Sequence, residues 1–417
     1  MTGLLITAIL FPIAGCVMGR RPLAECFLLG IGVVGSVMFV LGVFHVPFLL
    51  AVAVVVVAGL LGCWLARSRN TSVTEQLRNP ATILAIIPLI ALAIVAAVVP
   101  LHDFDGRAFW LLKAKALADE RVIDGPFFHN QIVNDPRNQY PLLLPLDAAT
   151  AMIASRDSDD REVRWLYIFT FAALVFVIAR RVNPWCAAIL AWTPQFAVSN
   201  EGGALTAYSD IALAAFIACA FLELIDGDSL LRFGLWLAFL VLTKNEGLPI
   251  ACVLLAIGIA SFRERIVQSI LPLLVAVAAL FAWRSHIPKT DEEDYFALIS
   301  SFPLHSSRFG PAVAEFVSHF FDFSKWGLFW IAALIALAVL VWKKEWRAPV
   351  IVAAIAMLYI GAYIVTNWTM HELIAASADR LLMHMAGPAL FAIARVSDVV
   401  AGSQPASRLR AGHHTVQ

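Results

Sequence analysis

Charged residues and cysteines are scarce in this sequence. Only 14% of the 417 residues are charged, and 30 Lys and Arg balance 30 Asp and Glu, whereas a soluble domain carries about 25% charged residues. A zero net charge offers no basic face for nucleic acid. The six cysteines lie in apolar stretches and form no CxxC pair. Neither a disulfide framework nor a cysteine-type zinc site is therefore supported.

The sequence signatures of several enzyme classes are also missing. There is no GxxxxGK[ST] phosphate loop, no GxSxG nucleophile turn and no HExxH zinc motif. No predicted span carries a series of acids and histidines in its interior, which argues against a proton-coupled pump. The sequence therefore carries the motif of none of these enzyme classes.

Long apolar stretches are abundant. Apolar residues make up 61% of the chain, and the mean hydropathy is +0.82. A helix needs about 20 apolar residues to cross a bilayer, and stretches near this length recur throughout. We predict an all-α polytopic membrane protein with about 13 spans, at 2–19, 23–44, 46–66, 80–100, 163–179, 184–200, 210–226, 229–243, 247–262, 267–283, 325–342, 348–366 and 381–400.

The basic residues alternate between the two ends of these spans. With the N-terminus outside, Lys and Arg fall in the cytoplasmic turns, at 20–21, 67–78, 180–181, 232, 263–265 and 343–347 and in the tail at 408–410. The short external turns at 45–47 and 200–209 contain no Lys or Arg. This asymmetry follows the positive-inside rule, and it fixes the predicted orientation.

We expect one transmembrane domain over 1–400, followed by a polar cytoplasmic tail over 401–417. Within it, 1–79 forms extra N-terminal spans, 80–283 forms a core and 325–400 forms the C-terminal spans. Long external loops are predicted at 101–162 and 284–324. The apolar stretch Tyr140–Ser155 is too short to cross and contains two prolines, so we expect it to lie in the outer interface.

The first external loop begins with two acids and two lysines. Asp103 and Asp105 follow the fourth span, and Lys113 and Lys115 come next beside Trp110. A helix carrying tryptophan and lysine suits the headgroup layer. The two aspartates are candidates for chemistry, although capping of that helix explains them equally well.

Three further polar groups fall at external helix ends. Asp210 opens a span and is either functional or a helix cap. Lys244 and Glu246 share a short turn, where Lys244 either pairs with Glu246 or binds a phosphate. Arg380 and His384 stand four residues apart and are expected on one helix face.

The order of these motifs resembles that of the GT-C superfamily of glycosyltransferases that use polyprenyl-phosphate sugars, such as protein O-mannosyltransferases and lipid A aminoarabinose transferases. The resemblance covers about 100–260. It rests on Asp105-Gly-Arg-Ala-Phe-Trp110, Tyr140-Pro-Leu-Leu-Leu-Pro145, Ala179-Arg-Arg181, Thr193-Pro194, Tyr208-Ser-Asp210 and Leu242-Thr-Lys-Asn-Glu-Gly247. The chain departs from the family in three respects. Gly106 replaces an acidic residue, Pro141-Leu142 replaces a proline pair, and three extra spans precede the span that leads into the acidic loop.

The resemblance implies that a sugar passes, with inversion, from a polyprenyl-phosphate donor to an external hydroxyl of a lipid, glycan or protein. Asp105 would be the catalytic base and Asp103 a second catalytic carboxylate. Lys244 and Arg380 would neutralise the leaving phosphate. The remaining substrate-binding candidates are Asp210, Glu246, Tyr140, Lys113 and His384.

No cofactor is implied with certainty, and a divalent metal ion is a possibility that the departures leave open. The expected location is a bacterial cytoplasmic membrane, with the site on its external face and membrane lipids around it. The competing hypotheses are a transporter or flippase, or a non-catalytic envelope-assembly protein.

Overall fold

The computed structural model describes residues 2–19, 21–65, 79–130, 138–156, 158–262, 266–288 and 298–400. Within these ranges all regular structure is helical, and no strand is present, as the sequence predicts. The tail over 401–417 and several of the basic residues that define the predicted orientation lie outside the described residues.

Six described helices are long and apolar enough to cross a membrane. Many of their large apolar side chains are exposed, as lipid contact requires. They are α2 (Leu23–Val43), α3 (Phe48–Leu65), α5 (Pro80–Val98), α9 (Asp160–Arg181), α15 (Val267–His286) and α20 (Arg347–Val365).

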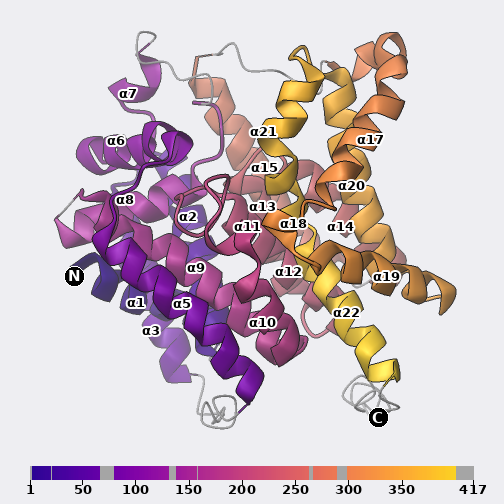
Figure 1. The fold of residues 1–417 in the computed structure, drawn as a ribbon. Coiled ribbons are helices and arrows are strands. Elements are labelled where there is room, and N and C mark those ends of the chain that lie inside the picture. Colours follow the sequence, from indigo (N-terminus) through magenta and orange to yellow (C-terminus); the bar gives the residue numbers. More distant parts are fainter. Residues whose placement is uncertain are drawn as a thin grey trace.

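Shorter apolar helices, which fall within other stretches predicted as spans, lie among these six (Figure 1). They are α1 (Thr2–Gly15), α10 (Pro184–Trp192), α12 (Asp210–Asp226), α13 (Leu230–Thr243), α14 (Gly247–Phe262), α19 (Phe329–Trp342) and α22 (Ala386–Val400).

Two predicted spans are broken in the structure. The stretch 184–200 forms only the nine-residue helix α10, because Pro194 has no N–H to continue it, and the short helix α11 (Pro194–Ala197) follows. The stretch 381–400 is divided near His384, where α21 (Met370–Met383) ends and α22 begins. The chain therefore changes direction beside two of the candidate site residues.

Two contacts place several helix ends on one side of the molecule. The backbone N–H of Gly3, at the start of α1, donates to Glu162 in the first turn of α9 at 2.7 Å. The N–H of Leu101, just after α5, donates to Asp160 at 2.8 Å. The start of α1, the end of α5 and the start of α9 therefore lie together, in agreement with the alternation predicted from charge.

The opposite ends of α9, α12 and α13 form a separate ion network. Arg181 contacts Glu223 at 3.1 Å and Asp226 at 2.6 Å. Arg232 binds the same Glu223 at 2.9 Å. Two of the arginines that set the predicted orientation are thus held by acids of the neighbouring helix.

The helix predicted over Tyr140–Ser155 is present as α8 (Leu143–Ser155), but its expected position is wrong. Every residue from Leu143 to Met152 is buried, and the helix packs against α1, α2, α6 and α9. A helix that is mostly apolar on all sides is typical of a position surrounded by protein. The neighbouring helices cover α8, rather than lipid headgroups.

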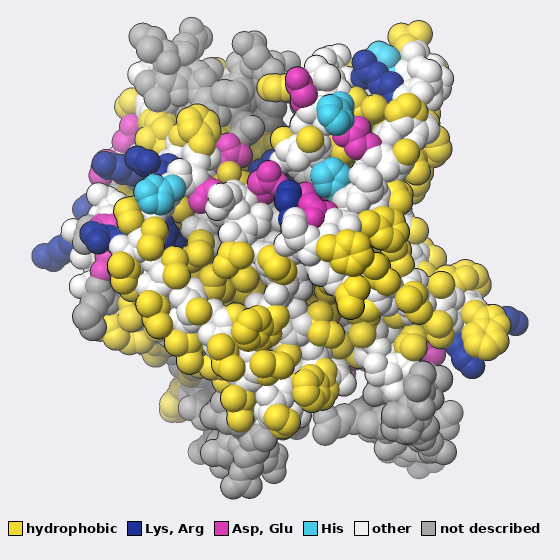
Figure 2. Space-filling view, viewed as in Figure 1, with side chains coloured by type: hydrophobic (Ala, Val, Ile, Leu, Met, Phe, Trp, Pro, Cys, Tyr) yellow, Lys and Arg dark blue, Asp and Glu magenta, His cyan; other side chains and the backbone are white. Residues whose placement is uncertain are grey.

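The remaining helices lie in the polar parts of the chain. After α5, the π-helical turn η2 (Gly106–Leu111) leads into α6 (Leu112–Glu120) and α7 (Pro126–His129). Before α19 come η4 (Ile299–Arg308), α17 (Phe309–His319) and α18 (Phe323–Trp326), and η1 (Cys16–Met18) follows α1. Figure 2 shows charged and histidine side chains gathered near α21 and α18, above a broad hydrophobic area.

Candidate functional site

Six of the nine candidate residues meet at one place, which we call the charged cluster. They come from the segment before η2, the start of α12, the turn between α13 and α14, and the end of α21. Its members are Asp105, Asp210, Lys244, Glu246, Arg380 and His384. The fold thus joins parts of the chain separated by up to 279 residues.

Lys244 lies at the centre of this cluster. Its Nζ is 3.0 Å from Oδ1 of Asp210 and 3.1 Å from Oε1 of Glu246. The Lys244 and Asp210 side chains are 8% and 2% exposed, whereas Glu246 is 27% exposed. The predicted pairing of Lys244 with Glu246 is therefore present, and the buried Asp210 is a second partner that spacing alone did not indicate.

His384 also contacts Asp210. Its Nε2 lies 3.2 Å from Oδ1 of Asp210, and its Nδ1 shares a hydrogen bond with the hydroxyl of Tyr359 in α20. The His384 side chain is fully buried. Because His384 is enclosed in this way, it has no open face for substrate.

Arg380 is the more accessible cation of the cluster. Its Nη1 lies 3.4 Å from Oδ2 of Asp105, which is longer than the 2.7–2.9 Å usual for a charge-assisted hydrogen bond. Its Nε is buried without a hydrogen-bond partner among the described residues. The guanidinium lies 5.5 Å from the ring centre of Tyr208. Arg380 thus retains donor capacity that the protein does not fill.

The loop before α12 encloses Arg380 closely. Gly202 has a φ of +85°, and a Cβ there would lie 3.1 Å from Cγ of Arg380 and 3.5 Å from Cβ of Asp210. A positive φ at this value favours glycine. The backbone of this loop therefore forms one wall of the cluster.

Gly106, which replaces an acidic residue of the resembled motif, has a structural explanation. A Cβ at this position would lie 2.0 Å from the carbonyl oxygen of Thr206, a distance that no side chain tolerates. The segment after Asp105 therefore packs directly on the loop before α12. This packing brings Asp105 to Arg380 and leaves no room for a second carboxylate at position 106.

Tyr140 and Lys113 lie in an adjoining aromatic cluster. Phe109, Trp110 and Tyr208 form a small buried group against which Tyr140 packs. The Nζ of Lys113 is 4.0 Å from the ring centre of Phe109, and Lys113 is only 1% exposed. The expectation that Lys113 faces the headgroups is therefore wrong, although Lys115, two residues later, is exposed.

Asp103 stands apart from the charged cluster. Burial raises the pKa of this carboxyl above its usual value, while the nearby Arg164 guanidinium works in the opposite direction. Arg164 itself is held by the carbonyl of Val99 at 2.7 Å. Asp103 is therefore a better proton acceptor near neutral pH than an ordinary aspartate, but it lacks the contact to Arg380 that Asp105 has.

Among the described residues, no group of three or more His, Cys, Asp or Glu side chains is arranged to hold a divalent metal ion. The Arg380 guanidinium lies against Asp105, in the position where a cation would neutralise that carboxylate. His371, in the first turn of α21, is 78% exposed and pairs with Glu315.

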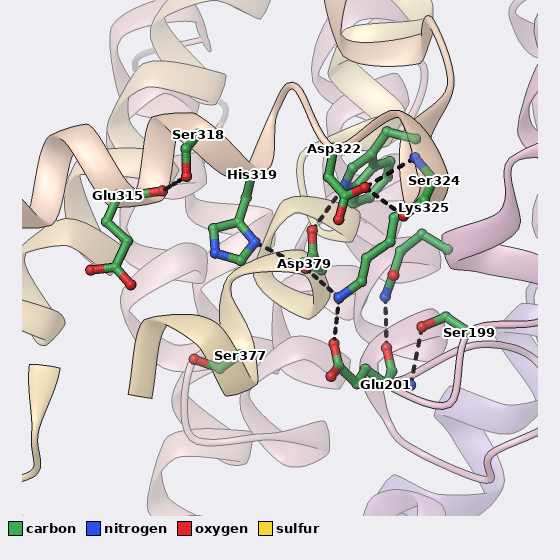
Figure 3. A network of polar contacts seen from close by, with 12 residues as sticks. Ser199, Glu201, Glu315, Ser318, His319, Asp322, Ser324, Lys325, Ser377 and Asp379 are labelled. Carbon is green, nitrogen blue, oxygen red and sulfur yellow. Dashed lines mark hydrogen bonds and ion pairs between the residues drawn. The ribbon is translucent and has the colours of Figure 1, made fainter. Parts of the chain in front are cut away.

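A second polar network, which sequence reasoning missed, lies beside the charged cluster (Figure 3). Lys325 and Trp326 of α18 and His319 of α17 all bind Asp379, which precedes Arg380. Lys325 also contacts Glu201 at 2.9 Å. We call these five residues the Asp379 network. Their spacing gave no signal, because Glu201 and Lys325 are 124 residues apart.

Asp147 is another acid that sequence reasoning missed. It lies in α8, is fully buried, and neither carboxyl oxygen has a hydrogen-bond partner among the described residues. The hydroxyl of Tyr167 in α9 is likewise buried and unpartnered there. Asp147 is a single acidic residue within an apolar stretch, so the sequence pattern did not indicate it as a candidate.

Comparisons with protein-family models, with curated proteins and with solved structures gave no match to this chain. The geometry of the charged cluster and the order of the motifs are therefore the features that bear on function.

Proposed function

We propose that this protein is a membrane glycosyltransferase of the GT-C type, which moves a sugar from a polyprenyl-phosphate donor to a hydroxyl acceptor. We place it in a bacterial cytoplasmic membrane with the charged cluster at the external face, following the charge alternation. The 13-span topology belongs to this proposal, as does the acceptor class of lipid, glycan or protein.

The observation that carries the proposal is the pairing of Arg380 with Asp105. The two residues are 275 positions apart, and each supplies one of the two groups that this reaction requires, a cation and a base. A leaving phosphate requires a cation, and arginine presents a fork of donors that suits phosphate. An attacking hydroxyl requires a nearby base, and a carboxylate is a suitable one.

The proposed reaction follows from these two roles. The donor phosphate accepts hydrogen bonds from the Arg380 guanidinium, including one from the buried Nε. This binding weakens the long contact between Arg380 and Asp105. Asp105 accepts the proton of the acceptor hydroxyl while the hydroxyl oxygen attacks the anomeric carbon of the donor sugar. The bond from that carbon to the phosphate oxygen breaks, the electron pair leaves with polyprenyl phosphate, and the configuration inverts. Arg380 stabilises the developing charge in a site of low exposure.

The other candidates have supporting roles in this scheme. Lys244 is already bound by two carboxylates, so we assign it to holding Asp210 and Glu246 rather than to direct phosphate binding. Asp210 provides negative potential that fixes Arg380 and Lys244. Tyr140 and the aromatic cluster form the wall against which the donor sugar lies.

Donor binding in nanodiscs tests the proposal. A panel of polyprenyl-phosphate sugars would be titrated into wild type, Asp105→Asn, Arg380→Ala and Lys244→Ala, with a neutral polyprenol as the ligand control. We expect saturable binding by wild type and by Asp105→Asn, and a loss of about tenfold or more for Arg380→Ala, as for one charge-assisted contact. If no polyprenyl-phosphate sugar bound, a transporter or an assembly protein would become the better interpretation.

A further inference from the structure

Lys325 links α21 to the loop before α12. Its Nζ is 2.7 Å from Oδ2 of Asp379 in α21 and 2.9 Å from Oε2 of Glu201 in the loop before α12. Asp379 is fully buried, whereas Glu201 is 41% exposed. The buried contact is therefore the stronger one, since an exposed ion pair contributes little.

Asp379 is saturated by its neighbours (Figure 3). Its Oδ2 also accepts from Nδ1 of His319 at 3.0 Å, and its Oδ1 accepts from Nε1 of Trp326 at 2.9 Å. Hydrogen bonds of this kind fix a carboxylate in one orientation and make its removal costly. Asp379 is thus a rigid anchor between α17, α18 and α21.

Each residue that Lys325 binds is adjacent in the chain to Arg380 or to a residue that packs against it. Asp379 precedes Arg380 in α21, and Glu201 precedes Gly202, whose backbone lies against the Arg380 side chain. The loop has further ties, because Gln195 donates to the carbonyl of Glu201 at 2.7 Å. A change in either segment therefore alters the position of the Arg380 guanidinium.

We propose that Lys325 and Asp379 are positioning residues, which hold α21 and the 200–203 loop in register so that Arg380 faces the donor phosphate. This inference rests on the proposed function. It also gives a role to the segment before α19, because α17 and α18 supply His319 and Lys325. Neither Lys325 nor Asp379 touches the substrate in this scheme.

A double-mutant cycle on binding of a long-chain polyprenyl phosphate in nanodiscs tests the proposal. The variants are Lys325→Met, Arg380→Ala and the pair, with Lys325→Arg as the rescue. Lys343→Met is the matched control, because Lys343 is exposed in the turn between α19 and α20. Glu201→Gln, on the exposed arm, serves if Lys325→Met does not fold.

We expect Lys325→Met to weaken binding about tenfold in wild type, and less than about twofold once Arg380 is absent, because contacts in one network are not additive. Lys325→Arg should recover most of the affinity, and Lys343→Met should change nothing. An equal loss in both backgrounds would mean that Lys325 acts independently of Arg380, and the proposal would be wrong.

The same cycle read by thermal unfolding needs no ligand. If wild type does not bind polyprenyl phosphate, the proposed function fails, but coupling between Lys325 and Arg380 in the unfolding midpoint would still support the positioning role. Strict additivity of the two midpoint shifts would overturn the positioning role by itself.

Discussion

The buried pair of Lys244 and Asp210 offers a sharp test of how the charged cluster is built. Replacing Lys244 by methionine keeps much of the side-chain volume and removes the charge. Asp210 is then left 2% exposed, and Nε2 of His384 remains 3.2 Å from its Oδ1. Glu246 is 27% exposed and can turn to water, so most of the penalty falls on Asp210.

Breaking a buried pair by removing one partner costs about 3–5 kcal/mol, because an uncompensated charge remains. We expect Lys244→Met to lie near the lower end, at about 3 kcal/mol, since His384 offers partial compensation. The free energy of unfolding would be measured by SDS titration of the protein in mixed micelles, with Lys343→Met as the control.

The double variant Lys244→Met, Asp210→Asn separates the charge effect from a simple loss of packing. It should recover a large part of the stability, because neither residue then leaves a buried charge unpaired. The reasoning would be refuted if Lys244→Met unfolded like wild type, or if the second substitution made the protein still less stable.

Three further substitutions test other parts of the structure. Gly106→Ala should destabilise the protein by about 1–3 kcal/mol, because its Cβ meets the carbonyl of Thr206; an unchanged unfolding midpoint would contradict this packing. Burial opposes ionisation of Asp379, but hydrogen bonds from His319 and its neighbours outweigh it and lower the pKa. Its stabilising contribution is therefore present above the ordinary pKa of 3.8 and is lost as the pH falls through the lowered one, so Asp379→Asn should flatten the acid side of the stability profile, and an unchanged slope would refute this. Asp147→Val removes two unpartnered buried oxygens and should raise the unfolding free energy by about 1–3 kcal/mol; a lower thermal midpoint would show that Asp147 has a partner.

Much of the helical fold could be predicted from the sequence, because apolar length and charge asymmetry report directly on the bilayer. The interruptions were harder to predict. Pro194 ends α10 by a local rule that the hydropathy of 184–200 obscured. The burial of α8 depends on which helices pack around it, and the local sequence pattern does not predict those neighbours.

Each residue of the charged cluster was named as a candidate from the sequence, but, apart from the pairing of Lys244 with Glu246, the contacts between them were not predicted. Arg380 and His384 were expected on one face because they are four residues apart, and both do lie toward Asp210. The pairing of Arg380 with Asp105 depends on packing between distant segments. The Asp379 network was missed for the same reason, since Lys325 and its two acidic partners share no sequence neighbourhood.

The central claim is that Asp105 is the base of a sugar transfer from a lipid phosphate. Membranes containing wild type or Asp105→Asn would be supplied with polyprenyl-phosphate donors carrying a labelled sugar, and the label leaving the lipid would be measured. We predict that wild type transfers the label to a product and that Asp105→Asn binds the donor but transfers at least about a hundredfold more slowly, as for loss of a general base. Transfer by Asp105→Asn at the wild-type rate, or no transfer by wild type from any donor, would contradict the account.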